Sequence, residues 1–197
     1  LDGSSAASDV YKRQVHGPAL RTEHGVYAIR YAGIDEMKQV EQWLAMNKAK
    51  NFEEWSAAVA LNHIQSFNFV YANRHGDIHF IHNAQLPVRA PGWNWQQYLP
   101  GNRSDLIWQR YHPTSALPQV TNPESGFVHS ANQTPFNITE PQDNPQPNAV
   151  PADGGWQTRM TNRATRGLEL FAEFEQISFD EAWELKHDNS YSANYRG

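Results

Sequence analysis

The stretch that decides the fold is SFNFVYANRHGDIHFIH, residues 66–82. Both ends of this stretch are rich in aromatic and β-branched residues, which favour strands. Between them, Asn73-Arg74-His75-Gly76 has the composition of a turn. The sequence therefore predicts a β-hairpin with strands over 66–72 and 77–82.

Successive side chains of a strand point to opposite faces, so the second strand of this hairpin has two distinct sides. Ile78, Phe80 and His82 are expected on one face, and Asp77, His79 and Ile81 on the other. His79 and His82 therefore cannot bind the same metal ion. We interpret both, together with His75 in the turn, as surface residues or as residues whose hydrogen bonds are satisfied within the hairpin.

Upstream of the hairpin, the pattern predicts two short strands within residues 15–30, with a break at 22–25. A helix is expected next, because apolar residues recur at three- and four-residue spacing and form one stripe. The stripe consists of Ile34, Met37, Val40, Trp43 and Leu44. A second helix is expected to begin at Asn51, where Glu54 completes a capping-box pattern. Its buried face is predicted to contain Phe52, Trp55, Ala58 and Val59.

Downstream, residues 84–121 are rich in Pro, Gly and Trp, and long irregular segments of this kind usually form functional walls. A strand is predicted at 126–131, followed by a polar, Pro-rich loop at 133–155. Two helices are expected to close the chain, one over 162–175 and one opened by a capping box at 178–181. This order predicts a mixed α/β (α+β) fold rather than a doubly wound sheet.

Composition and charge exclude several classes of function. The formal net charge is −5 and no basic stripe occurs, which argues against nucleic acid as a partner. No apolar run approaches the ~18 residues that a membrane-spanning helix needs. The chain has no cysteine, so disulfides, thiolate metal sites and cysteine nucleophiles are excluded. Residues 1–14 are small, polar and aperiodic, and we interpret them as a non-native or disordered tail before one domain over 15–197.

A series of short motifs runs through that domain in a fixed order. They are VHGP at 15–18, YAIR at 27–30, AKNFEEW at 49–55, NFVYANRHGDI at 68–78, LPVR at 86–89, NPESGFV at 122–128, ANQTP at 131–135, NR at 162–163 and FDEAW at 179–183. In this order they resemble the β-chain of the penicillin acylase family of N-terminal-nucleophile hydrolases. Asn73 stands where that family usually has Asp. The resemblance implies a fragment of the four-layer αββα sandwich, in which residues 15–197 form part of the β-chain.

The family's chemistry implies roles for two residues of this chain. These enzymes attack an amide with the hydroxyl of an N-terminal Ser, whose own α-amine is the base. By position, Asn132 corresponds to the side-chain donor of the oxyanion hole, and Arg163 to an arginine that supports the catalytic centre. In the family the nucleophilic Ser follows a Gly far upstream of the VHG element, so we expect it to be missing from this chain. Gly3-Ser4-Ser5 lies within the tail and is not taken as that nucleophile, so this chain alone is expected to be inactive.

Further expectations follow from the same resemblance. His16 and Gly17 are expected to be structural, and Asp143 is a candidate ligand for a structural calcium ion; no other cofactor is expected. The partners are expected to be the acylase α-chain and the remaining β-chain, released from one precursor by self-cleavage. Export to the periplasm or the outside is implied. The substrate class is an acyl amide, such as an N-acyl-homoserine lactone, an acylated peptide or a β-lactam side chain.

Three alternatives remain at the level of sequence. Trp93, Trp95 and Trp108 could pack the irregular wall and line one side of an acyl cleft, or they could stack on a sugar in a carbohydrate- or ligand-binding module. The chain could also belong to a catalytically empty acylase paralogue. Asn132 itself could simply form a turn before Pro135, because Asn is a common turn former.

Overall fold

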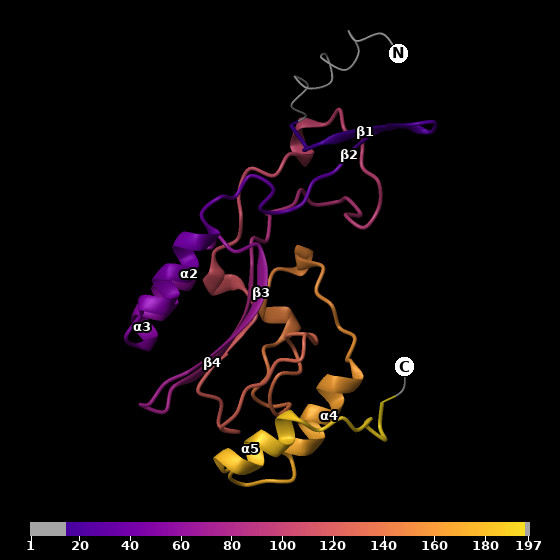
Figure 1. Cartoon of the computed structure of the whole chain (residues 1–197). Coiled ribbons are helices and arrows are strands. Elements are labelled where there is room, and N and C mark those ends of the chain that lie inside the picture. Colours follow the sequence, from indigo (N-terminus) through magenta and orange to yellow (C-terminus); the bar gives the residue numbers. More distant parts are fainter. Residues whose placement is uncertain (1–14, 196–197) are drawn as a thin grey trace.

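The computed structural model describes residues 15–195, so the predicted tail at 1–14 lies outside the described residues. The strands are β1 (Ala19–Thr22), β2 (Gly25–Ala28), β3 (Ser66–Ala72), β4 (Ile78–Ala84) and β5 (Gln119–Thr121). The α-helices are α2 (Gln39–Lys48), α3 (Phe52–Val59), α4 (Asn162–Phe171) and α5 (Phe179–Lys186). Figure 1 shows β3 and β4 in the middle of the molecule, α2 and α3 on one side, and α4 and α5 near one end.

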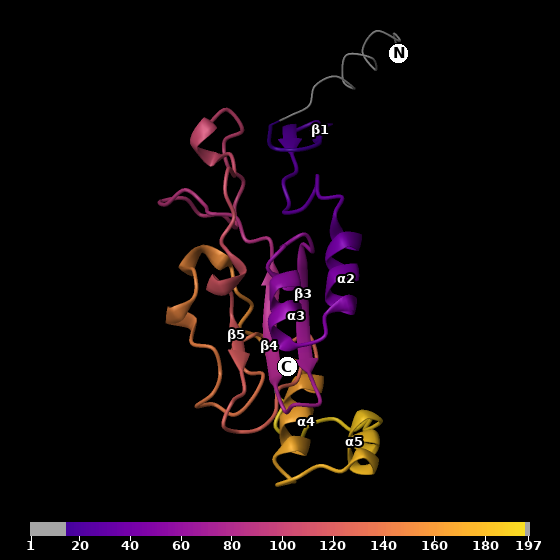
Figure 2. The same cartoon turned by 90° about the vertical axis from the view of Figure 1, so that its left-hand side faces the viewer.

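The central sheet has the strand order β3-β4-β5, and both pairings are antiparallel. The predicted hairpin is confirmed, with Phe69 opposite Ile81 and Asn68 opposite His82. One face of the sheet is covered by α3 and α2 (Figure 2). The other face lies against the irregular segment that follows β5, where Asn68 Nδ2 donates a hydrogen bond to Ser130 Oγ at 3.2 Å.

The hydrophobic core lies between the sheet and the two helices. It consists of Met46, Trp55, Ala58, Val59, Ile64, Phe69 and Ile81. The helix α3 begins as the sequence predicts, because the Asn51 side chain accepts a hydrogen bond from Glu54 N at 2.8 Å. This cap fixes the direction of α3, so that Trp55 packs edge-on against Phe69 with 6.2 Å between ring centroids.

The preceding helix, α2, departs from its prediction in two ways. It begins at Gln39, so Ile34 and Met37 precede it, and most of the predicted apolar stripe faces solvent. The fully buried residue is instead Gln42. Its Oε1 accepts hydrogen bonds from His63 N at 2.6 Å and Ile64 N at 2.9 Å, which satisfies backbone groups just after α3. Apolar spacing could not reveal a buried glutamine with this role.

The strand predicted at 126–131 is wrong. The third strand of the sheet is instead β5, which is short because Pro118 and Pro123 flank it and cannot donate ladder hydrogen bonds. Within 126–131, His129 N donates to Ile138 O at 2.9 Å, but no ladder follows. The helix predicted over 162–175 ends earlier, at Phe171.

The first two strands form a separate hairpin that lies away from the central sheet (Figure 1). Its break falls where the sequence predicts it, between Thr22 and Gly25. Gly17 precedes the hairpin with φ of 126°, and a Cβ at this position would overlap the carbonyl oxygen of Ile29. A glycine is therefore favoured where the chain enters the hairpin.

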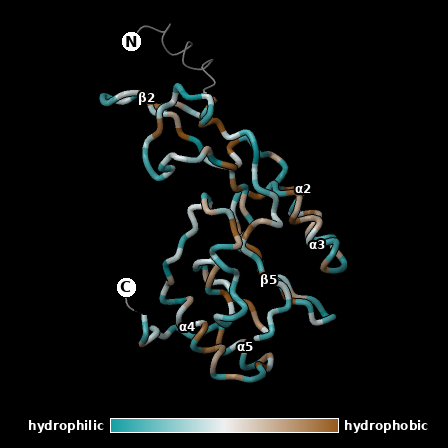
Figure 3. The backbone as a smooth tube through the Cα atoms, turned by 180° about the vertical axis from the view of Figure 1, so that it is seen from behind, coloured by the Kyte–Doolittle hydropathy of each residue, from teal (hydrophilic) through white to brown (hydrophobic). Residues whose placement is uncertain are grey.

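Hydrophobic residues occur in short runs along the whole chain (Figure 3). Among the helices described, none combines the length and the apolar character that crossing a membrane requires.

Candidate active site

The loop around Asn132 is held by one buried side chain. Gln133 is buried, and its Oε1 accepts a hydrogen bond from Ala131 N at 2.6 Å. Its Nε2 donates to the carbonyl oxygens of His129 at 3.3 Å and Asn137 at 3.0 Å. These bonds join both sides of the loop, and Asn132 between them adopts φ of 61°. Asn tolerates this left-handed conformation better than most residues, and its side chain is thereby exposed.

Arg163 comes to Asn132 from the first turn of α4. The helix begins where the Thr161 side chain accepts a hydrogen bond from Ala164 N at 3.3 Å. Arg163 Nη2 then donates to Asn132 Oδ1 at 3.0 Å. A guanidinium has only donors, so it fixes the amide oxygen of Asn132 on its own side. The amide nitrogen of Asn132, with its two N–H groups, therefore points away from Arg163. The structure thus brings together the two residues that the sequence singled out.

A pocket of about 580 Å³ lies beside Asn132. Its walls come from both strands of the central hairpin, from the loop of Asn132 and from the loop at 154–157. Leu86, Pro135 and Trp156 supply apolar surface, while the polar residues of the lining are Ser66, Asn68, His82, Asn132, Gln133 and Gln157. The pocket therefore offers both apolar contacts and hydrogen-bonding groups to a small molecule.

Two of these polar groups are paired across the hairpin. His82 Nδ1 lies 2.6 Å from Asn68 Oδ1. The ring of His82 meets the ring of Trp156 edge-on, with 5.8 Å between centroids. Burial lowers the pKa of His82 below its usual range, so the ring is neutral at pH 7. The indole of Trp156 is fixed in turn, because its Nε1 donates to Pro151 O at 2.9 Å.

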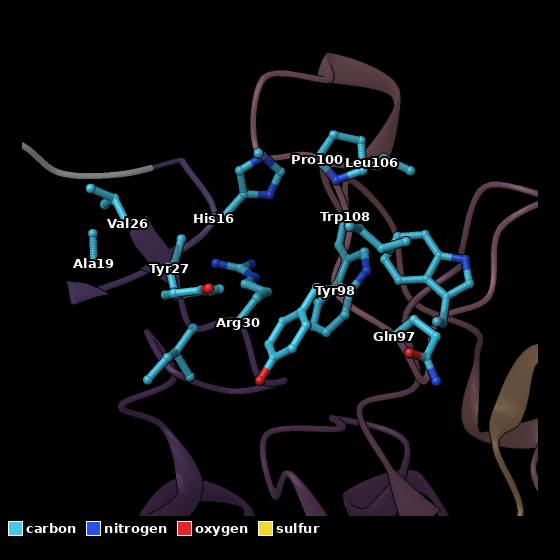
Figure 4. Close-up of a pocket in the computed structure, with 15 residues that line it drawn as sticks. His16, Ala19, Val26, Tyr27, Arg30, Gln97, Tyr98, Pro100, Leu106 and Trp108 are labelled. Atoms are coloured by element: carbon cyan, nitrogen blue, oxygen red, sulfur yellow. The ribbon is translucent and has the colours of Figure 1, made fainter. Parts of the chain in front are cut away.

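The predicted tryptophans lie elsewhere. Trp95 and Trp108 line a second pocket, of about 570 Å³, between the β1–β2 hairpin and the irregular segment. Figure 4 shows Tyr27 and Arg30 from the hairpin side, and Tyr98 and Trp108 from the irregular segment, around this hollow. Neither tryptophan lines the pocket beside Asn132.

Arginine side chains lie over the faces of these tryptophans. Arg89 Cζ is 5.9 Å from the ring centroid of Trp95 and 5.8 Å from that of Trp108. Arg103 Cζ lies 5.4 Å from the centroid of Trp93. A guanidinium stacked at this distance is stabilised by the ring, and it occupies the surface that a sugar ring would need. The arrangement favours packing of the irregular wall over sugar stacking.

The remaining predicted residues have simpler surroundings. His16 lies on the wall of the second pocket, next to Gly17 at the entry to the hairpin. Asp143 Oδ2 accepts a hydrogen bond from Ser125 N at 2.8 Å, and thus holds the turn after Pro123. Within residues 15–195, no group of three or more His, Asp or Glu side chains is placed to hold a metal ion.

Sequence reasoning did not identify several residues of the pocket. Gln133 lies within the ANQTP motif, but nothing in the sequence distinguishes a buried glutamine that orders a loop from an exposed one. Trp156 stands alone after Gly154 and Gly155 in a polar loop, and this isolated aromatic residue was a usable signal. His82 was interpreted only as a satisfied hairpin residue, because the pocket beside it forms through long-range contacts.

Comparison with known proteins gives a consistent result. The chain is 27% identical over 182 residues to penicillin G acylase from Escherichia coli, and the alignment covers 90% of this chain but 20% of that protein. The fold of this chain is similar to part of the solved structure of a thermostable penicillin G acylase from Alcaligenes faecalis, with a TM-score of 0.66 and 23% sequence identity. It covers 88% of this chain and 30% of that one.

The structural similarity confirms the expected mixed α+β fold, which this chain shares with part of that penicillin G acylase. The chain spans about a fifth of the length of the curated relative that it matches. The family model for penicillin amidase matches residues 2–196, nearly the whole sequence. The chain therefore belongs to the penicillin amidase family.

Proposed function

We propose that this chain forms one wall of the active site of an acyl amide hydrolase. The observation that carries the proposal is the hydrogen bond from Arg163 to the amide oxygen of Asn132, which leaves the amide nitrogen free beside a pocket. Membership of the penicillin amidase family supports the same reaction. The products are a carboxylic acid and an amine.

The chemistry assigned to Asn132 is stabilisation of negative charge. The hydroxyl of an N-terminal serine, supplied from outside residues 15–195, adds to the amide carbonyl and gives up its proton to its own α-amine. The carbonyl oxygen becomes an oxyanion, which accepts a hydrogen bond from Asn132 Nδ2. The C–N bond then breaks, the amine leaves with the proton, and water hydrolyses the acyl-serine. One such donor typically contributes ~3–4 kcal/mol to stabilisation of the transition state.

Arg163 is the positioning residue in this mechanism. An unrestrained asparagine can place either its oxygen or its nitrogen toward the substrate, and an oxygen there would repel the oxyanion. Because the guanidinium can only donate, it selects the orientation with nitrogen toward the pocket. Gln133 and the left-handed backbone of Asn132 hold the loop in the position that this contact requires.

The pocket supports an acyl group as the part of the substrate bound here. Leu86, Pro135 and Trp156 contribute apolar surface to it, and its volume of about 580 Å³ admits a small acyl chain or ring. N-acyl-homoserine lactones, acylated peptides and acylated β-lactams all fit this description, and we propose that the substrate is of this class.

Further polypeptide is expected to complete the site. Met37, Val40 and Leu44 of the region around α2 are largely exposed, as is Phe67 on β3. The relative from Escherichia coli is about five times as long as the segment it shares with this chain. We propose that the acylase α-chain and the remaining β-chain of one precursor pack here, and that the assembly is periplasmic or secreted, as the family resemblance implies.

The test is an Asn132→Ala substitution in the complete gene product. Release of 4-nitroaniline from its phenylacetyl amide measures turnover directly. We expect kcat to fall about 100- to 1000-fold while KM changes little, because the lost donor acts mainly in the transition state. Asn137→Ala is the matched control, since Asn137 belongs to the same loop but does not line the pocket, and it should keep kcat within about twofold.

Two results would count against the proposal. Equal activity of Asn132→Ala and the wild-type protein would remove Asn132 from the reaction. Wild-type protein that hydrolyses no acyl amide, although fully folded, would instead identify a catalytically empty paralogue. Arg163→Met should reproduce most of the loss in kcat, and Arg163→Lys should restore part of it, because lysine can still donate to the amide oxygen.

A further inference from the structure

The pocket beside Asn132 contains a second polar group whose role is not explained by hydrolysis. His82 lies on the face of β4 opposite the core, and its cross-strand neighbour Asn68 lies on the same face of β3. Both line the pocket together with Trp156. The hydrogen-bond partners of Asn68 determine which nitrogen of His82 carries the proton.

Asn68 is oriented by a residue outside the hairpin. Its Nδ2 donates to Ser130 Oγ at 3.2 Å, which turns its Oδ1 toward His82 Nδ1 at 2.6 Å. An amide oxygen can only accept, so Nδ1 carries the proton of this bond. Burial lowers the pKa of His82, and the neutral ring holds only one N–H. The other nitrogen, Nε2, is therefore an acceptor with a free lone pair.

That acceptor is accessible from the pocket. Among residues 15–195, none is hydrogen-bonded to His82 Nε2. An atom without a hydrogen-bond partner is either buried or accessible. His82 Nε2 is not among the buried side-chain atoms of this region that lack a partner, so it is accessible. The ring of Trp156, which meets His82 edge-on, makes the surroundings partly apolar, where a single hydrogen bond discriminates more strongly than in water.

We propose that His82 Nε2 recognises a hydroxyl group on the acyl part of the substrate, so that the preferred substrates are hydroxyacyl amides. This inference rests on the proposed function, because it assumes that the pocket beside Asn132 holds the acyl group. The residues that line the pocket include no Asp or Glu to balance a cationic amine. A neutral hydroxyl therefore suits the site better than an ammonium group.

The first experiment measures binding of small amides to the chain of 197 residues by NMR. Hexanamide is compared with its 2-, 3-, 4- and 5-hydroxy derivatives. We expect one position of the hydroxyl to raise the affinity about tenfold over hexanamide, the effect of one well-made hydrogen bond. The ¹⁵N signal of His82 Nε2 should report an unprotonated nitrogen in the free protein and should shift when that ligand binds.

Two variants separate the two ring nitrogens. His82→Gln places an amide oxygen near the position of Nε2, so it should keep most of the preference for the hydroxylated ligand. His82→Asn reaches only the position of Nδ1, so it should bind both ligands equally. His79→Asn is the matched control, because His79 lies on the opposite face of the same strand and is buried against Phe52 and Trp55. It should leave the preference unchanged.

Several outcomes would overturn the inference. They are a proton on Nε2 in place of Nδ1, no gain from a hydroxyl at any position, failure of every amide to bind, or a preference that survives in His82→Asn. Failure of the proposed function looks different. In that case the hydroxyl preference depends on His82, but Asn132→Ala leaves turnover of the complete gene product unchanged.

Discussion

Asparagine side chains, more than charged groups, order the loops next to the pocket. Asn144 accepts hydrogen bonds from Ile138 N at 2.8 Å and Thr139 N at 3.2 Å, and donates to Thr139 O at 3.1 Å. Asn122 accepts from Ile78 N at 2.8 Å and so ties the end of β5 to the start of β4. An amide both donates and accepts without titrating, so these connections do not depend on pH. The pH dependence of stability must therefore come from other residues.

Buried histidines contribute to that pH dependence, and two of them have strongly lowered pKa values. Burial lowers the pKa of His79 and of His129 to about 4, from 6.5 for the free side chain. Between pH 6.5 and pH 4, each histidine is protonated in the unfolded chain but neutral in the folded chain. The contribution to the free energy of unfolding is therefore fully present above pH 6.5 and is lost as the pH falls toward 4. Each histidine should remove up to about 3 kcal/mol from the free energy of unfolding across this range.

The measurement is urea denaturation between pH 7 and pH 4 for the wild-type chain and two variants. His129→Gln should lose less stability on acidification, because glutamine does not titrate. His24→Gln, at an exposed position in the β1–β2 turn, should follow the wild-type curve. Parallel curves for all three proteins would show that protonation of His129 does not oppose folding.

At the scale of elements, the β1–β2 hairpin depends on how the chain enters it. Gly17 and Gly25 both have positive φ, at 126° and 141°, but only at Gly17 would a Cβ overlap another atom, the carbonyl oxygen of Ile29. Gly17→Ala therefore combines backbone strain with a steric clash, whereas Gly25→Ala adds only strain.

We expect amide exchange in residues 18–29 to accelerate at least tenfold more in Gly17→Ala than in Gly25→Ala, as followed by hydrogen-exchange NMR. The hydrogen bond from Ile29 N to Pro18 O, at 2.8 Å, should be the first to lose protection. Equal protection in the two variants would mean that the close approach at Gly17 does not support the hairpin.

The elements that sequence predicted well are those whose local signals and packing agree. The strand at 66–72 alternates cleanly, α3 has a cap at Asn51, and α5 has a capping box at Ser178 that the structure contains. The prediction fails where contacts between residues far apart in the sequence determine the local structure. Gln42 is buried because it bonds to the segment after α3, and β5 is a strand only because β4 offers it an edge. The same limit applies to the site, where motif order predicted Asn132 and Arg163 but not the buried partner Gln133.

At the scale of the whole molecule, the two pockets lie in different parts of the chain. The pocket beside Asn132 is built on the central hairpin, and the tryptophan-lined pocket lies at the β1–β2 hairpin. Apolar side chains are exposed around both regions, among them Leu20, Val26, Tyr98, Val70 and Phe67. Exposed apolar surface on this scale is typical of surfaces that bind another polypeptide. The clearest instance is α2, because its exposed residues are adjacent on one helix.

The surface of α2 leads to a prediction about assembly. Val40 is 75% exposed and Leu44 is 52% exposed, one helical turn apart. If the rest of the gene product covers them, each buried side chain stabilises the assembly by about 1.5–3 kcal/mol. The double variant Val40→Glu/Leu44→Glu should therefore bind the co-expressed remainder at least ten times more weakly, as measured by affinity capture, while the isolated chain becomes more soluble. Gln109→Glu/Gln142→Glu adds two charges at exposed polar positions and should leave binding unchanged. Capture by both double variants at the wild-type level would mean that this face of α2 stays in solvent in the assembled protein.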